Sequence, residues 1–182
     1  MALRLDRVSD RIGQVVPWLA LLMVLVGAFN TVVRYLDPRL GTQLSSNAYL
    51  ELQWYLFSLL FLLGGAWTLK QDRHVRVDVL YTRWSARTRT WIDLAGTLLF
   101  LIPFTVVGIR VCWPPVRASW AIREGSPDPD GLARYPIKTV ILIGFALLLV
   151  QAIANLLHQI AILRGREAAH QPTPHGPAEG GL

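Results

Sequence analysis

Four long apolar stretches constrain the fold of this chain more than any other feature of its sequence. They are residues 15–33, 52–69, 92–113 and 140–163. The only acidic, basic or histidine side chains within them are Asp93, Arg110 and His158. A helix that crosses the hydrocarbon of a bilayer needs about 20 mainly apolar residues, and only a helix satisfies its own backbone there within one segment. The pattern therefore predicts an all-α integral membrane protein with four transmembrane helices.

The composition agrees with a membrane protein and excludes several other classes. Hydrophobic residues make up 53% of the 182 residues and charged residues 16%, whereas a soluble domain averages roughly 25% charged residues. The single cysteine, Cys112, excludes an intramolecular disulfide and a cysteine-based metal site. Because no nucleotide-binding or catalytic motif is present, we expect no enzymatic activity, no cofactor and no metal site. The net charge of +6 is attributed to membrane orientation rather than to nucleic-acid binding.

The distribution of Lys and Arg predicts the orientation in the membrane. Eleven of these residues fall before the first stretch, between the second and third, or after the fourth, and seven fall on the other side. Basic residues gather on the cytoplasmic side, so both termini are expected inside the cell. Residues 1–14 are then a cytoplasmic segment, residues 15–163 the four-helix membrane domain, and residues 164–182 a disordered cytoplasmic tail. The first stretch is too long for a typical cleaved signal peptide and is read as a retained anchor.

The connection between the second and third stretches has a helical pattern of its own. Its apolar residues Val77, Leu80, Tyr81 and Trp84 follow the i, i+3, i+4, i+7 spacing of an amphipathic helix. We expect a short interfacial helix on the inner leaflet, with Arg76, Arg83 and Arg87 near the lipid headgroups. A solvated basic loop remains the alternative.

The two connections on the other side contain signals for turns and helix starts. The first is expected over residues 34–50, with Ser46 among the candidate N-caps and Glu51 in the first helical turn, where the helix dipole favours a carboxylate. The second is expected over residues 114–136. It contains the turn-forming segment 126–131, Ser-Pro-Asp-Pro-Asp-Gly.

A few polar residues in or beside the apolar stretches are candidates for protein contacts. Gln151, Asn155 and His158 follow near-helical spacing on the fourth stretch, and Glu51 and Trp54 form a polar and aromatic entry to the second. Polar side chains inside a membrane usually face protein rather than lipid. We favour a subunit or bundle interface for these five residues over an ion path.

The order of several short segments resembles a known family. These segments are residues 51–57 (Glu-Leu-Gln-Trp-Tyr-Leu-Phe), 64–66 (Gly-Gly-Ala), 72–78 (Asp-Arg-His-Val-Arg-Val-Asp), 92–96 (Ile-Asp-Leu-Ala-Gly), 103–104 (Pro-Phe), 126–132 (Ser-Pro-Asp-Pro-Asp-Gly-Leu) and 135–138 (Tyr-Pro-Ile-Lys). Together they resemble the small permease subunit of tripartite ATP-independent periplasmic (TRAP) transporters, the DctQ family. The resemblance covers roughly residues 8–163.

The resemblance implies a function that the residue pattern alone does not give. Such a subunit pairs with a large permease subunit, while a periplasmic solute-binding protein delivers the substrate, typically an organic acid. An ion gradient, commonly sodium, drives uptake into the cell across the bacterial inner membrane. The large subunit carries substrate and ions, and the small subunit serves as a membrane scaffold. The 126–132 segment looks like those of systems for α-keto or related carboxylic acids. The alternative function is a self-sufficient small tetraspan channel or carrier.

Overall fold

The computed structural model describes residues 2–41, 44–71 and 84–165, and the side chains of residues 2–9 and 40 are not described. Its helices are α1 (Ala2–Leu40), α2 (Asn47–Lys70), α4 (Ala86–Gly96), the π-helix η1 (Thr97–Leu101), α5 (Ile102–Ala121) and α6 (Arg134–Leu163). Four helical segments are long and apolar enough to cross a membrane, namely Asp10–Arg39, Asn47–Lys70, Ala86–Ala121 and Arg134–Leu163. The predicted all-α membrane fold with four transmembrane helices is confirmed. Most of the expected interfacial helix, including Arg76 and Arg83, lies outside the described residues.

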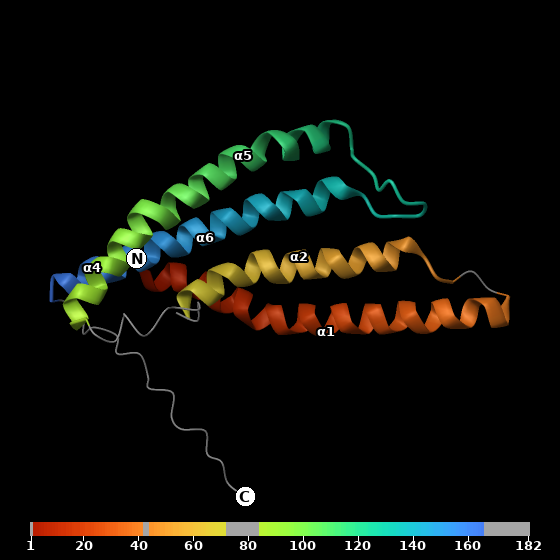
Figure 1. Ribbon diagram of the computed structural model, residues 1–182, viewed down its shortest axis with the longest axis horizontal. Helices are drawn as coiled ribbons and strands as arrows, with labels where there is room; N and C mark the ends of the chain where they lie inside the picture. The colour runs from red at the N-terminus through yellow and green to blue at the C-terminus, as the bar shows by residue number, and fades with distance from the viewer. Residues whose placement is uncertain (1, 42–43, 72–83, 166–182) are drawn as a thin grey trace, which may run out of the picture.

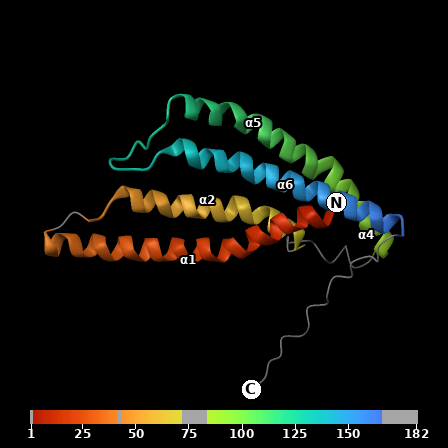
Figure 2. The same ribbon diagram turned by 180° about the vertical axis from the view of Figure 1, so that it is seen from behind.

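The four long segments run up and down the bundle (Figure 1). Residues 44–46 and the connection 122–133 lie at one end, which we call the loop end. The start of α1, the end of α2, the start of α4 and the end of α6 lie at the opposite end, which we call the terminal end. The view from behind shows the same arrangement (Figure 2). The start of α1 and the end of α6 therefore lie at the same end of the bundle.

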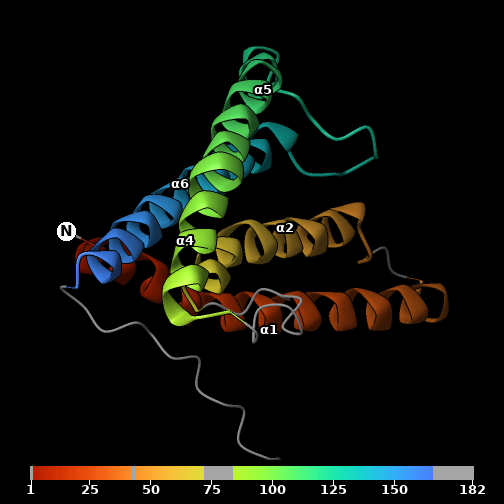
Figure 3. The same cartoon turned by 60° about the vertical axis from the view of Figure 1, so that its left-hand side comes forward.

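Helix α6 lies between the other helices and contacts each of them. It packs against α1, α2, α4, η1 and α5, whereas α1 packs mainly against α2. Figure 3 shows α5 crossing away from the plane of α1 and α2, with α6 between them. Small residues permit the close approaches. A Cβ atom at Gly144 of α6 would come within 2.9 Å of Leu62 Cβ, and one at Gly108 of α5 would come within 2.6 Å of Phe145. Close helix contacts through small residues are typical of membrane bundles.

The outer surface of the bundle is strongly apolar, and several of its buried side chains are polar. Among the described residues, the largest fully buried side chains are Gln151, Glu51, Thr105 and Ser119. Large apolar side chains face outward, for example Trp18, Phe61 and Phe100, whose exposed fractions are 70%, 67% and 75%. Lipid solvates such side chains as well as a protein core would, so nothing drives them inside. The burial pattern thus supports a lipid-facing outer surface.

Proline residues account for local irregularity in two helices. Pro17 lies inside α1, which changes direction in its first third (Figures 1 and 2). Proline has no N–H and its ring displaces the carbonyl four residues earlier, here that of Gly13. In the third crossing, the N–H of Ile102 bonds to the carbonyl of Thr97, five residues back, just before Pro103. Pro103 has no N–H and cannot donate the ordinary α-helical hydrogen bond, and the π-turn forms directly before it.

The helices extend past the apolar stretches at the loop end. Helix α1 continues to Leu40, and α5 runs through Pro114 and Pro115 to Ala121. The connections are therefore residues 41–46 and 122–133, shorter than the expected 34–50 and 114–136. The apolar pattern shows where a helix crosses hydrocarbon, but a helix can continue into the polar region, where water satisfies its backbone.

Candidate functional site

Glu51 of α2 is a buried polar residue at the loop end that joins its helix to the second loop. Its side chain is 1% exposed. Ser126 donates its hydroxyl to Glu51 Oε1, and the backbone N–H of Leu132 donates to Oε2 over 2.5 Å. Glu51 was expected in the first turn of its helix, and this was wrong. The helix begins at Asn47, capped by the Ser46 side chain, so Glu51 lies in the second turn. Its carboxylate accepts bonds from the second loop rather than from its own helix N-terminus.

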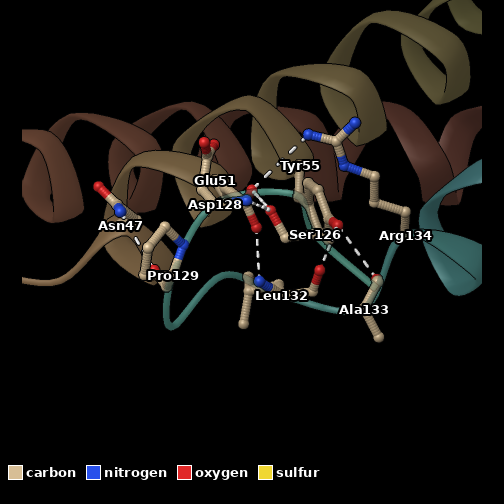
Figure 4. Close-up of polar contacts among 9 residues, drawn as sticks. All are labelled: Asn47, Glu51, Tyr55, Ser126, Asp128, Pro129, Leu132, Ala133 and Arg134. Carbon is tan, nitrogen blue, oxygen red and sulfur yellow. Dashed lines mark hydrogen bonds and ion pairs between the residues drawn. The ribbon is translucent and has the colours of Figure 1, made fainter. Parts of the chain in front are cut away.

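The segment 126–133 is fixed to α2 at several points in addition to Glu51 (Figure 4). Asn47 donates its side-chain amide to the carbonyl of Pro129 over 3.1 Å. The Tyr55 hydroxyl donates to the carbonyl of Ala133 over 3.0 Å. These contacts join residues 78 to 82 positions apart in the chain. They hold the loop along the first three turns of α2.

Within the loop, Ser126 and Gly131 form the tight part of the turn. The Ser126 oxygen also accepts the N–H of Asp128 over 3.1 Å, and the N–H of Gly131 bonds to the Asp128 carbonyl over 3.2 Å. A Cβ atom at Gly131 would collide with the Ser126 side chain and lie 2.8 Å from Glu51 Oε2. Only glycine leaves room for the carboxylate at this position. The turn predicted from segment 126–131 is therefore a binding partner of Glu51.

Arg134, at the start of α6, adds a positive charge beside this carboxylate. Its Nη2 atom lies 3.8 Å from Glu51 Oε1, and its guanidinium carbon lies 5.7 Å from the centre of the Trp54 ring. Trp54 is 50% exposed. The arginine thus bridges the buried carboxylate and an aromatic ring at the surface, an arrangement in which a cation–π contact is favourable. Both carboxylate oxygens of Glu51 are already engaged within this chain.

A second ion pair closes the loop on the side of α5. Lys138 of α6 donates to Glu124 Oε2, and the N–H of Arg134 bonds to the Glu124 carbonyl over 2.8 Å. The hydrogen bond from Lys138 lowers the pKa of Glu124 below its ordinary value of 4.5. Beside it, Trp120 donates its ring N–H to the Thr139 hydroxyl over 2.8 Å. The second loop is therefore attached to α2, α5 and α6.

The polar residues of α6 separate into buried and exposed members. Gln151 is fully buried and donates its amide to Asn155 Oδ1 over 3.1 Å. Asn155 is half-buried, whereas His158 is exposed. Gln151 and Asn155 thus lie together inside the bundle, and His158 faces outward. This grouping could not be derived from their spacing, because 151, 155 and 158 share one helical stripe.

The predicted headgroup contacts are only partly within the described residues. Arg87 is exposed in the first turn of α4, whose N-cap Ser85 accepts the N–H of Thr88 over 3.3 Å. Arg76 and Arg83 lie outside the described residues. An exposed arginine at a helix start near the terminal end is compatible with a headgroup contact.

Sequence reasoning identified Glu51 but not the residues that bind it. Ser126 and the following turn were recognised as a loop, and Tyr55 and Arg134 were not singled out. The sequence did contain one signal, an acidic residue beside an apolar helix. If such a carboxylate is buried, it requires hydrogen-bond donors from elsewhere in the chain. The sequence does not say which of the loops supplies them.

Comparison with known proteins identifies the family. The family described as tripartite ATP-independent periplasmic transporters, DctQ component, matches residues 23–161. This range contains about the second half of α1, from residue 23, and nearly all of the rest of the bundle, including Glu51 and both connections at the loop end. No curated protein and no solved structure matches the chain significantly. Since the match covers more than half of the sequence, the chain belongs to the DctQ family of TRAP transporter components.

Proposed function

We propose that this chain is the small membrane subunit of a TRAP-type secondary transporter that takes up an organic acid. It would pair with a large permease subunit, and a periplasmic solute-binding protein would deliver the substrate. Membership of the DctQ family is the observation that carries this proposal. The buried polar side chains agree with it, because Glu51 and Gln151 bond to partners within the chain itself.

The proposed role of the chain is that of a scaffold. Transporters that bind their own substrate usually place charges or broken helices near the membrane midplane. Here the carboxylate of Glu51 is buried at the loop end and accepts one hydrogen bond on each oxygen from within the chain. We infer that Trp54 and His158, which are exposed, are the candidates for contact with the large subunit. Glu51, Gln151 and Asn155 would stabilise the bundle itself.

Transport assays can separate this proposal from the alternative of a self-sufficient channel or carrier. The full chain, a large permease subunit of the same family of transporters and a solute-binding protein that copurify with it would be reconstituted together in liposomes, and each would be omitted in turn. We expect solute uptake under an inward sodium gradient only when all three are present. Uptake by vesicles that contain this chain alone would overturn the scaffold role. Uptake without this chain would show that the proposed assembly is wrong.

We also propose that the chain lies in the bacterial inner membrane with both termini cytoplasmic. The bias of Lys and Arg toward the terminal end supports this orientation. In a Cys112→Ser background, cysteines introduced at Ser45 and Gly125 should react with an impermeant reagent added outside. A cysteine at Ser85 should react only after the membrane is permeabilised. If the cysteine introduced at Ser85 reacted in intact cells, the chain would have the opposite orientation to the one proposed.

A further inference from the structure

A shallow groove lies between α1 and α2 near the terminal end of the bundle. It has a volume of about 260 Å³. Its lining residues are Arg11, Ile12, Val15, Val16 and Leu19 of α1 and Leu63 of α2. Apart from the arginine, every lining side chain is aliphatic. The groove therefore offers a polar solute almost no hydrogen-bonding partner but fits a hydrocarbon chain.

Neighbouring residues indicate the depth of this groove in the membrane. Trp67 packs closely against Gly13, and Lys70 lies 2.5 Å from Asp10. Tryptophan and lysine gather where hydrocarbon meets the headgroups, so this level marks the interface. From Arg11 to Leu19, eight residues rise about 12 Å along the helix. That rise is close to half of the ~30 Å hydrocarbon core, so the groove follows most of one leaflet from the headgroup level inward.

Arg11 provides a positive charge at the headgroup end of the groove. Its side chain is exposed. The adjacent carboxylate, Asp10, pairs with Lys70 instead. Among the side chains that the structure describes, no carboxylate lies within ion-pair distance of Arg11. A guanidinium in this position can bind a phosphate oxygen pair through two parallel hydrogen bonds.

We propose that this groove binds one anionic phospholipid from the leaflet at the terminal end. The headgroup phosphate would lie on Arg11, and one acyl chain would follow Ile12, Val15 and Leu19 toward Leu63. The aliphatic lining and the arginine at its headgroup end match the two parts of such a lipid. The inference concerns this chain by itself and does not depend on its role in transport.

Lipid titration of the full chain tests the proposal. The protein is purified in detergent, delipidated, and titrated with dioleoylphosphatidylglycerol or dioleoylphosphatidylcholine while native mass spectrometry counts the bound lipids. We expect one tight phosphatidylglycerol site, with weaker binding of phosphatidylcholine. Arg11→Gln should weaken this site about fivefold, the change expected for losing one basic residue near an anionic headgroup. Arg34→Gln, at the other end of α1, should leave the site unchanged. An equal effect of both variants would indicate general charge attraction and overturn the proposal.

A second pair of variants tests the apolar part of the site. Val15 lines the groove, and Val24 is exposed on the same helix away from it, with exposed fractions of 52% and 60%. Val15→Trp should fill the groove and abolish the tight site, whereas Val24→Trp should retain it. Equal retention in both variants would overturn the proposal. If Val15→Trp fails to fold, the comparison of Arg11→Gln with Arg34→Gln still tests whether the groove binds the lipid.

Two competitors define what else could occupy the groove. Inorganic phosphate at millimolar concentration should not displace the lipid, because it lacks an acyl chain. Displacement by phosphate alone would reduce the site to an anion site on Arg11 and overturn the lipid assignment. If copurified large permease subunit displaced the lipid from the wild-type chain, the groove would be a protein contact instead.

Discussion

The two ends of the bundle hold their neighbouring segments in different ways. At the loop end, the Glu51 carboxylate is buried and accepts two hydrogen bonds from the second loop. At the terminal end, the described link between α1 and α2 is the Asp10–Lys70 pair, whose side chains are 46% and 22% exposed. Buried, charged hydrogen bonds are costly to break, whereas exposed ion pairs contribute little because water screens them. The comparison indicates that polar bonds fix the loop end, while helix packing determines the terminal end.

The largest expected effect comes from removing the buried carboxylate. In Glu51→Leu, the Ser126 hydroxyl and the Leu132 N–H lose their acceptor, and Arg134 loses its negative neighbour. Buried donors without partners destabilise a fold strongly. We expect the melting temperature of the purified chain to fall by on the order of 5–10 °C, with faster proteolysis of the 122–133 loop. Glu51→Gln keeps one acceptor oxygen, so its melting temperature should lie between those of wild type and Glu51→Leu. An unchanged melting temperature for Glu51→Leu would refute the assigned role.

A smaller loss is expected when the turn is enlarged by one methyl group. Gly131→Ala places its Cβ against the Ser126 side chain and 2.8 Å from Glu51 Oε2. Overpacking of this kind costs about 1–3 kcal/mol. Gly125→Ala is the matched control, because nothing lies within 4 Å of a Cβ there. Denaturant titration of both variants should show destabilisation at position 131 only. Equal stability would mean that the loop moves freely relative to α2.

The buried amide pair of α6 should contribute less than the loop contacts. Replacing Gln151 and Asn155 together by leucine removes their 3.1 Å hydrogen bond. A polar contact between side chains in a membrane is worth about 0.6 kcal/mol on average and up to roughly 2 kcal/mol. We expect a small loss of thermal stability in the isolated chain, with the large subunit still copurifying.

His158→Leu is the control for this pair, because His158 is exposed on the same helix. It should leave the stability of the isolated chain unchanged, and weaker copurification would assign His158 to the subunit interface. Loss of the large subunit from the double variant, with unchanged stability of the chain, would move the amide pair to that interface instead.

Acid should weaken the outer ion pair of the loop end in a defined direction. The hydrogen bond from Lys138 lowers the pKa of Glu124 in the folded chain, so its contribution to stability is present above about pH 4.5 and is lost as the pH falls through the lowered value. The melting temperature of wild type should exceed that of Glu124→Gln at pH 7, and the difference should begin to shrink as the pH falls below about 4.5. A difference that grew as the pH fell below 4.5 would contradict this assignment.

The smallest effect is expected at the terminal end. Asp10→Asn removes a carboxylate that pairs with Lys70, but surface ion pairs contribute only about 0–1 kcal/mol. The melting temperature should change by about 4 °C or less, and 0.5 M salt should reduce even that difference. If Asp10→Asn lowered the melting temperature as much as Glu51→Leu, the proposed difference in polar bonding between the two ends would be wrong.

Much of the fold follows from the sequence, because length and apolarity decide which segments cross a membrane. The four predicted stretches each lie within a long helix, from α1 to α6. The helix ends at the loop end were not predictable in the same way. Pro114 and Pro115 are typical of a loop start, yet α5 continues for two turns beyond Pro114. Where water can reach the carbonyls that proline leaves unbonded, a helix can continue at modest cost.

The candidate site was predictable in its centre but not in its partners. Glu51 stands out in the sequence because an acidic residue beside an apolar stretch requires compensation. Its partners Ser126 and Leu132 lie 75 and 81 residues away. Helical spacing relates residues within one helix and carries no information about which loop reaches another helix. The same limit applied to His158, whose exposure depends on where α6 meets its neighbours.

The π-turn at Thr97–Leu101 has a consequence for how one long helix serves two contacts. A π-turn holds one residue more than an ordinary turn, so it acts like an insertion into the third crossing. Each residue advances a helix by about 100°. The stripe that α4 turns toward α6 is therefore out of phase with the stripe that α5 turns toward α6, although both contact it. Shortening this segment by one residue would swing the far half of the crossing about its axis and aim Thr105 and Ser119 at lipid.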